Sequence, residues 1–436
     1  MRKLTLIAAT ALSLIACQNE NLADSTSPFE MKSASAEYLT ASSLPVTTVS
    51  GTITTNTTWS GVVELDGVVT VKNGATLTIA PGTFVKAKPS AANTATGVLV
   101  ISRGSKINAE GTSTQPIIFT SYKLLDGDEN TAASPGDFGG VIVLGGAPTN
   151  KPTTTVIEGL SGTDYQYGGT NSSDNSGVMK YVRIEFAGYD LLSPNSGNEI
   201  NGLTLGGVGN ATTLDHIQVA YGKDDSFEFF GGTVNASNLI SFAADDDNFD
   251  FDFGYSGTIN CALALADQNS THSQSGGSPD SNGIELDNDG TGSSASPFTH
   301  PVINNLTIVG ASISTFGSLY ENAIHVRRNG KLTLTNTTVT GYSVGVLLET
   351  VSGAAVNLSD LTFTNVQSYA HNSGFAFASR VGSTSTPNLV VPGGTTTTLN
   401  GGMPQPFFNS GTVDLGGRNC GNFFASWTKY DFSVAE

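Results

Sequence analysis

The sequence contains few basic residues, and this shortage limits the partners that the protein can have. Its 436 residues include 19 Lys and Arg but 37 Asp and Glu, which gives a formal net charge of −18 at pH 7. A nucleic-acid partner is excluded, because no cluster of Lys and Arg is present to meet the phosphates. The negative charge is compatible with a solvated extracellular surface and with cation binding, and solubility alone would also explain it.

Cysteine and histidine are also scarce, and their scarcity argues against several kinds of site. The chain has three cysteines, Cys17, Cys261 and Cys420, and no histidine lies at ligand spacing beside the last two, so a zinc site is not expected. Cys261 and Cys420 could pair in an oxidising compartment or remain free thiols. The sequence has no P-loop, nucleophile elbow or HExxH motif.

Long apolar runs are missing except at the N-terminus. Residues 4–16 are apolar and follow a basic start, but the run is too short to span a bilayer, so 1–16 is predicted to be a signal peptide. The run ends in LIAC, which resembles the lipobox of bacterial lipoproteins. The resemblance implies cleavage before Cys17, lipidation of Cys17 and anchoring in a membrane. An ordinary signal peptide with an incidental cysteine is the alternative.

The segment after Cys17 is polar. Residues 17–48 are rich in Ser, Thr and Ala and are predicted to form a flexible tether to a single domain, 49–436. The tether starts with QNEN, a polar and acidic beginning that resembles the signal of lipoproteins that reach the cell surface. The expected location is therefore the outer membrane, with the protein lipid-anchored and exposed at the surface.

Strand and turn formers are abundant, and a short phrase repeats among them. The chain has 51 glycines and only 13% charged residues, a composition that favours strands and turns over helices. The phrase is Asn or Asp, then a small or polar residue, then apolar-x-apolar. Its copies start at Asn201, Asp225, Asp247, Asn282 and Asn322, which are 24, 22, 35 and 40 residues apart.

An interval of 22–24 residues fits one coil of three short strands and three corners. The sequence therefore predicts an all-β fold, a single-stranded right-handed parallel β-helix (β-solenoid) with N- and C-terminal caps. The longer intervals are coils with loops inserted at a corner. Trp59 is expected in the first coil, and the aromatic residues of 422–430 are expected to close the last.

Stacked copies of the phrase would bring carboxylates together. Asp225 and Asp247 would lie about 4.8 Å apart on adjacent strands, with Glu228 and Asp250 beside them on the outer face. Such pairs repel by roughly 3 kcal/mol each unless a cation neutralises them, and hard oxygen ligands suit Ca²⁺. A solvated acidic face is the alternative. The candidate calcium ligands are Asp224, Asp225, Glu228, Asp246, Asp247, Asp250, Asp252, Asp287 and Asp289. The last two belong to DNDGTG, for which a simple turn is the competing interpretation.

The sequence offers little support for the chemistry of known β-helix enzymes. Polygalacturonase-like enzymes pair acids with Gly-His-Gly and Arg-x-Lys motifs, and the chain has neither. Pectate-lyase-like enzymes need calcium and an Arg or Lys base, for which Lys223, Arg183 and Arg327 are conceivable. Nothing in the spacing selects one of them, so no catalytic residue is assigned.

Several strings together resemble one family. GVVTVKNGATLTIAPGT, GDFGGVIVLGGAP, DDDNFDFDFGYSGTI and NGIELDNDG are similar to bacterial secreted or surface lipoproteins with parallel β-helix folds, over residues 49–380. The resemblance implies a fold and a location but no reaction. Some members carry transporter labels, which conflict with the lack of a membrane-spanning segment in this sequence.

The expected function is non-enzymatic binding of a glycan, a matrix or a partner outer-membrane protein. Tyr221, Tyr255 and His325, with the loops 267–281 and 287–300, are the candidate ligand contacts. His325 takes the place of Glu228 in its copy of the phrase and is expected to point outward near the acids. The alternatives are a calcium-dependent polysaccharide lyase or glycoside hydrolase, and a structural surface-layer or filament subunit.

Overall fold

The computed structural model describes most of the chain after its first 34 residues. The described residues are 35–89, 97–188, 200–267, 273–275, 278–310, 321–350, 357–369, 371, 375–387, 389–391, 395–396, 420–424 and 426–429. The signal peptide, Cys17 and much of the expected tether lie outside these ranges.

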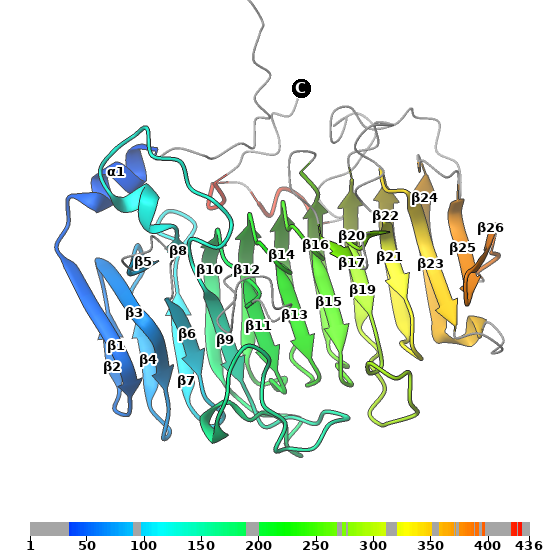
Figure 1. The fold of residues 1–436 in the computed structure, drawn as a ribbon, viewed down its shortest axis with the longest axis horizontal. Helices are drawn as coiled ribbons and strands as arrows, with labels where there is room; N and C mark the ends of the chain where they lie inside the picture. Colours follow the sequence, from blue (N-terminus) through cyan, green and yellow to red (C-terminus); the bar gives the residue numbers. More distant parts are fainter. Residues whose placement is uncertain are drawn as a thin grey trace, which may run out of the picture. The chain divides into compact units, whose positions relative to one another are not determined.

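Parallel strands stack coil upon coil into a right-handed parallel β-helix with three sheets (Figure 1). The first sheet faces the viewer in Figure 1 and contains β6 (Val98–Ile101), β9 (Gly140–Leu144), β11 (Leu203–Gly206), β13 (Phe227–Phe230), β15 (Phe249–Asp252), β19 (Ile284–Leu286), β21 (Asn322–Val326), β23 (Val344–Thr350) and β25 (Phe375–Val381). The second begins with β2 (Thr57–Trp59), β4 (Thr76–Ile79) and β7 (Lys106–Glu110). The third includes β1 (Val46–Ile53), β5 (Phe84–Ala87), β8 (Ile117–Thr120) and β27 (Thr395–Thr396).

Long bent strands join the sheets. They are β3 (Val62–Val71), β10 (Gly177–Glu185), β12 (Thr213–Ala220), β14 (Ala236–Phe242), β16 (Thr258–Leu265), β20 (Val302–Val309), β22 (Leu332–Thr340) and β24 (Leu361–Tyr369). From β10 onward, each contributes its first half to the second sheet and its second half to the third. The bend falls on one residue with positive φ, such as Asn238, Asn305 or Asn336, because Asn tolerates the left-handed conformation better than most residues. The Asn336 amide donates to Oδ1 of Asn305 on the neighbouring coil (3.2 Å).

The repeated phrase forms the first sheet in the expected register. Phe227 pairs with Phe249 and Glu228 with Asp250, and Asp250 in turn pairs with Glu285. The rings of Phe227 and Phe249 stack inside the coil with centroids 5.2 Å apart. Because strand side chains alternate, their neighbours in the phrase point out of the coil. The prediction of stacked acids is therefore confirmed. Trp59 is buried on β2, in the first coil, as expected.

Secondary structure begins earlier than the sequence predicted. Helix α1 (Ala36–Ser42) and the start of β1 lie inside the segment 17–48 that was expected to be a flexible tether, so that boundary is wrong. The helix is held by Tyr38, which is fully buried and donates a 2.6 Å hydrogen bond to Glu185. The Arg183 guanidinium lies 2.7 Å from Glu37. A short polar segment without an apolar stripe gave no sign of this anchoring.

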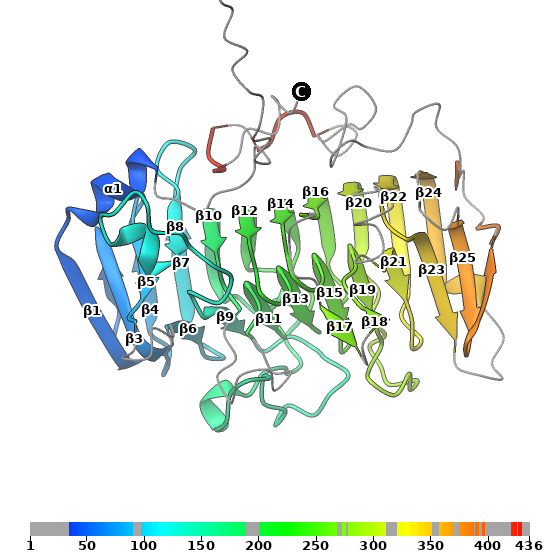
Figure 2. The same ribbon diagram turned by 45° about the horizontal axis from the view of Figure 1, so that its top comes forward.

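The C-terminal residues return to the side of the coil. Cys261 and Cys420 form a disulfide that links β16 to a segment 159 residues later. Trp427 is buried against Tyr181 and His216, and Lys429 reaches Ser35 and Glu37 of the N-terminal helix. In Figure 2 this segment lies above β10–β16. The described aromatic residues of this cluster, Phe423, Phe424 and Trp427, thus lie at a side of the solenoid, and the expectation that they close the last coil is wrong. Tyr430 lies outside the described residues.

The remaining elements are short. They are β17 (Gln274–Ser275), β18 (Ser278–Pro279), β26 (Thr384–Pro387) and the 3₁₀ turns η1 (Tyr122–Leu125), η2 (Thr163–Tyr165) and η3 (Leu358–Asp360). Among the residues described, no helix has the length and apolar character needed to cross a membrane.

Candidate functional site: an acidic patch on the first sheet

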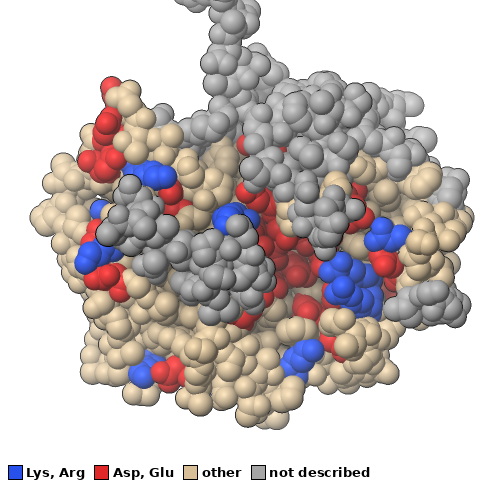
Figure 3. Space-filling view, viewed as in Figure 1, with Lys and Arg blue, Asp and Glu red and all other residues tan. Residues whose placement is uncertain are grey.

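Carboxylates gather over the middle of the first sheet. Figure 3 shows Asp and Glu in a hollow at this place, with Lys and Arg at one side. We call the acidic patch the set formed by Asp224, Asp225, Glu228, Asp246, Asp247, Asp250, Asp252 and Glu285. They come from β13, β15, β19 and the turns that lead into them.

The turns before these strands are tied together by a row of side chains that we call the Asx ladder. The backbone N–H of Asp247 donates to Oδ1 of Asp225 (2.9 Å), that of Asn282 to Asp247 (2.6 Å), and that of Asn322 to Asn282 (3.1 Å). Each side-chain oxygen therefore accepts from the next coil. The repeat thus aligns Asn and Asp at one corner, and their side chains join each coil to the next. Residues with left-handed backbone lie elsewhere, at the bends in the long strands.

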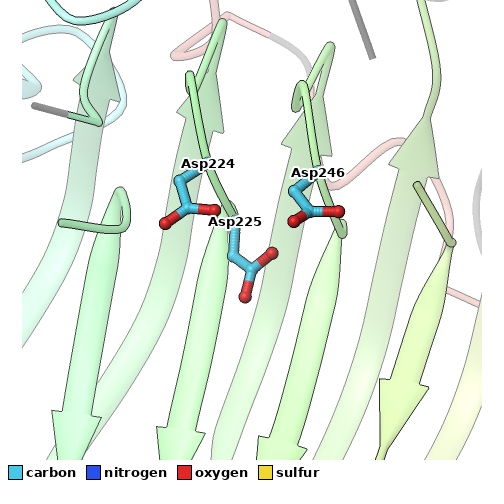
Figure 4. A group of neighbouring side chains, drawn as sticks. All are labelled: Asp224, Asp225 and Asp246. Atoms are coloured by element: carbon cyan, nitrogen blue, oxygen red, sulfur yellow. The ribbon is translucent and has the colours of Figure 1, made fainter. Parts of the chain in front are cut away.

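Three groups of carboxylates have ligand atoms close enough to share an ion. They are Asp224, Asp225 and Asp246; Asp225, Glu228 and Asp250; and Asp247, Asp250 and Glu285, and in each group the oxygens lie within 4.8 Å of one another. Figure 4 shows the first group, with Asp224 and Asp225 on the turn into β13 and Asp246 on the turn into β15. The groups overlap, because Asp225 and Asp250 each belong to two of them.

Burial makes these carboxylates costly to ionise. Burial, with Asp224 and Asp247 nearby, raises the pKa of Asp225, and burial raises the pKa of Asp250 to about 8, with a smaller contribution from Asp287. Burial likewise raises the pKa of Asp246 to about 7, and burial with Asp250 raises that of Asp252 to about 9. Desolvation and like charge act in the same direction here, so a cation at the patch would relieve both.

Two acids at the edge of the patch already have counter-charges. Arg327 contacts Glu285 through Nη2, and its Nε lies 3.1 Å from Asp287, which also meets Arg328 at 2.7 Å. Burial lowers the pKa of Arg327, and Arg328 lowers it further. A cavity of 220 Å³ opens beside Arg327 and Arg328 and is also lined by Glu349. Asp287, a predicted calcium ligand, is thus an ion-pair partner at the boundary.

Further along the sheet the outward side chains are paired. His325 follows Glu285 in register, as expected, but its side chain is only 1% exposed. Its Nε2 lies 2.8 Å from Glu349, which Arg380 also contacts. Arg380 reaches Glu321 at 3.2 Å as well. His325 is therefore not available as the ligand contact that was predicted.

The other two predicted contacts are also buried. Tyr255 has no exposed surface, stacks on Phe251 inside the coil and donates to the Val234 carbonyl. Tyr221 is 7% exposed and stacks on Phe186 at a corner. Both predictions are wrong, because these aromatic side chains fill the core. The loop 267–281 lies partly outside the described residues.

Asp289 is not part of the patch. Its carboxylate accepts hydrogen bonds from Thr291 and Ser293, including both backbone N–H groups, and these bonds lower its pKa. This arrangement supports the simple turn that was the competing interpretation, and Asp289 belongs to none of the three carboxylate groups. Its assignment as a calcium ligand stays a prediction.

Two functional features were missed from the sequence. Glu285 occupies the same place in its phrase as Glu228 and Asp250, so the repeat could have identified it as a ligand. The Arg327–Asp287 contact joins residues 40 positions apart across an insertion, and no periodic signal marks it. Of the cations considered as a base, Arg183 lies on the third sheet beneath α1, and Arg327 lies on the first sheet beside the patch.

Comparison with known proteins gives one match. Neither the curated proteins nor the solved structures contain a match to this chain. A family model described as a pectate-lyase-like beta-helix domain matches residues 51–404. That range covers most of the chain and every residue of the acidic patch, and its fold is the one described above. The chain therefore belongs to the pectate-lyase-like beta-helix family.

Proposed function

We propose that the protein is a cell-envelope module that binds Ca²⁺ in the acidic patch and, through the ion, an acidic polysaccharide. The family is compatible with a role in carbohydrate recognition. The proposal goes further, because it names the ion, the class of glycan and the residues that hold them.

The observation that carries the proposal is the exchange of Asn for Asp along the Asx ladder. Asn282 accepts the same backbone bond from the next coil that Asp225 and Asp247 accept. An amide oxygen therefore suffices for this structural role. Two adjacent coils nevertheless carry carboxylates, whose like charges are costly when buried. Binding of a cation would explain the charge at Asp225 and Asp247, which the ladder itself does not require.

The donor set fits a hard cation. All the candidate ligands are carboxylates, and Ca²⁺ accepts about six to eight oxygens in flexible arrangements. Oδ1 of Asp250 is buried and has no hydrogen-bond partner among the described residues, although Asp250 belongs to two of the three groups. Asp225, Glu228 and Asp250 form no ion pair with Lys or Arg in the described part of the chain. Asp225, Glu228, Asp246, Asp247, Asp250 and Glu285 would hold the ion.

The ligand class follows from charge. A bound cation next to Arg327 and Arg328 would place positive charge beside the 220 Å³ cavity. Sugar carboxylates could complete the coordination of the ion and meet the Arg328 side chain, which is 40% exposed. Without the ion, the patch would repel the same polymer. Binding should therefore require calcium and favour uronic-acid polymers over neutral ones.

The test is a binding titration on the full chain carrying Cys17→Ser, which removes the predicted lipid site. Polygalacturonate and alginate are titrated by calorimetry with calcium or with EDTA, with dextran as the neutral control. We expect binding of an acidic polymer only with calcium. The double variant Asp225→Asn/Asp247→Asn, which keeps the ladder acceptors, should lose it. Glu110→Gln, an exposed acid on β7, should not. Calcium-independent binding, or binding retained by the double variant, would refute the proposal.

The proposed location rests on the N-terminal sequence. The basic start, the apolar run and LIAC before Cys17 support a lipid anchor in the outer membrane. Fractionation should find the native chain in membranes and Cys17→Ala in the soluble fraction. Protease treatment of intact cells then distinguishes a surface-exposed protein from a periplasmic one.

A calcium-dependent lyase is the second candidate, and the position of Arg327 supports it. This side chain has a lowered pKa and lies beside the three carboxylate groups. In that reading Arg327 would take the proton at C5 of a uronic-acid residue. The C4–O bond to the neighbouring sugar would break with its electron pair on the oxygen, which takes a proton from water, and an unsaturated sugar end would remain. Ultraviolet absorbance of that product, lost in Arg327→Lys while binding persists, would favour the lyase. Binding without product would favour the module.

A further inference from the structure

The two ends of the solenoid are finished differently. At the C-terminal end, β26 folds back and pairs antiparallel with β25, from Val381 and Thr384 to Ala378 and Pro387. At the N-terminal end, β1 pairs with β3 and with no other strand in the described part of the chain. Figures 1 and 2 show β1 at the outer end of the stack. One side of β1 therefore presents backbone N–H and C=O groups without strand partners.

The sequence of β1 does not discourage pairing. Proteins protect exposed strand edges with charged residues, prolines or bulges that turn the edge away. The strand VTTVSGTI has no charged residue and no proline, and six of its eight residues are exposed. Its register shifts once, between Ser50 and Thr52, so the regular part of the edge is Val46–Ser50. Over these residues the edge is neutral and accessible.

Apolar exposure is concentrated at the same end. The large hydrophobic side chains that are exposed in the described residues are Leu44 at 45%, Val46 at 46% and Val390 at 79%. Two of the three lie where β1 starts, because Val46 is its first residue and Leu44 lies two residues before it. Exposed apolar residues beside an unpaired edge are typical of an interaction site.

The charges near β1 are balanced, unlike those of the protein as a whole. Glu64 on β3 lies 3.3 Å from Lys86, and Asp66 lies 2.7 Å from Lys88. A chain of net charge −18 repels copies of itself where acids accumulate. At this end, β1 is uncharged and the two neighbouring acids are paired with lysines, so neither positive nor negative charge is in excess. The surface suits a partner that is itself acidic and has the same neutral edge, so it suits a second copy of the chain.

We propose that the N-terminal end of the solenoid is a dimer interface, in which β1 pairs antiparallel with β1 of a second copy across a two-fold axis. Antiparallel pairing of identical strands is self-complementary. The C-terminal edge of β25 is already covered by β26, so an N-terminal edge cannot add to it in the same way. The assembly therefore closes as a dimer and does not extend into a filament. This inference is independent of calcium and glycan binding.

The test is the mass in solution of the full chain carrying Cys17→Ser, measured by sedimentation over a wide range of concentration. We expect a dimer. Thr48→Lys/Ser50→Lys places like charges across the axis and should give a monomer. Thr362→Lys/Thr364→Lys adds the same charge on exposed positions of β24, at the other end of the stack, and should leave the dimer intact.

Amide hydrogen exchange supplies a second readout. In the dimer, β1 amides should exchange more slowly than in the Thr48→Lys/Ser50→Lys monomer, and circular dichroism should show that both are folded. A monomeric parent protein at every concentration would overturn the proposal. So would a monomer with protected β1 amides, which would assign the edge to the chain's own N-terminal residues. Assemblies larger than a dimer would contradict the closed arrangement.

Discussion

Two regions of the first sheet carry acids on the same outer face, but only one region pairs its acids with basic side chains. Over β13 and β15, Asp225, Glu228 and Asp250 lie close to other carboxylates. Over β21–β25, Glu349 and Glu321 contact Arg380, and Glu349 also meets His325. The backbone is the same in both, so the fold does not impose the unbalanced charge. The paired region has its counter-charges within the chain, whereas the acidic region, among the described residues, lacks one, and the cation proposed above would supply it.

Removing the arginine at the boundary should have the largest effect, because it turns a paired region into an acidic one. Arg327→Met leaves Glu285 and Asp287 with less counter-charge in a poorly solvated place. Breaking such a pair from one side costs about 3–5 kcal/mol, and we expect about 3 kcal/mol by urea unfolding in EDTA, since the site is partly open. Lys72→Met, which breaks the exposed pair with Asp164, should cost about 1 kcal/mol or less. Equal losses would remove the distinction between the regions.

Calcium should raise the free energy of unfolding only in proteins whose acidic patch is intact. At about 100 times its dissociation constant, a ligand that binds only the folded state adds about 2.7 kcal/mol to the free energy of unfolding. The parent protein and Glu349→Gln, in the paired region, should both show this gain. Asp225→Asn/Asp247→Asn should not, and in EDTA it should be more stable than the parent. An unchanged calcium response in the double variant would place the ion elsewhere.

The next effect is the pH dependence of the free energy of unfolding. Burial raises the pKa of Asp287 to about 6 and that of Asp250 to about 8, against about 3.9 in the unfolded chain. Because the folded state favours the neutral acids, this contribution is complete below pH 4 and is lost as the pH rises from there to the folded pKa, about 6 for Asp287 and about 8 for Asp250.

In EDTA, we therefore expect the free energy of unfolding to fall by about 1–2 kcal/mol between pH 7 and pH 9 as Asp250 ionises, since its folded pKa lies about one unit above pH 7 and one pKa unit corresponds to about 1.4 kcal/mol. Calcium should remove most of this fall, because the bound ion stabilises the ionised form. Urea titrations at several pH values provide the measurement. A rise in stability over this range in EDTA would be the opposite of what burial of these acids requires.

The smallest effect is expected within the paired region. His325→Gln removes one contact to Glu349, which keeps Arg380, so the loss should be about 1 kcal/mol or less. Calcium affinity, measured by titration calorimetry, should stay unchanged. A large change in that affinity would extend the cation site to β21.

The sequence contained enough to predict the coil and the alignment of the acids. Alternation in the phrase fixes which side chains enter the core, and its repetition fixes that Phe227 stacks on Phe249. It could not show which outward side chains gain a partner. Arg327 reaches Asp287 across an insertion, and contacts of that kind depend on loop geometry. Tyr255 was misassigned because the sequence does not show whether an aromatic residue after a strand points into the core or out to solvent.

The links between distant parts of the chain were equally hidden. The pairing of Cys261 with Cys420 was left open, since a spacing of 159 residues carries no signal. Helix α1 is held by contacts to Arg183 and Glu185 on β10, which lie almost 150 residues away from it. In both cases the local sequence carries no signal, and the structure depends on a contact between distant parts of the chain.

The return of the C-terminal residues to α1 determines how the molecule would carry a mechanical load. A pull on the chain at Ser35 passes to β10 through Glu37 and Arg183. It also passes through Lys429 and the Cys420–Cys261 bond to β16. The force is thus divided between two coils in the middle of the stack and largely bypasses the first ones. A tethered molecule under tension would resist peeling from its N-terminal coil, and a reducing agent would remove one of the two paths.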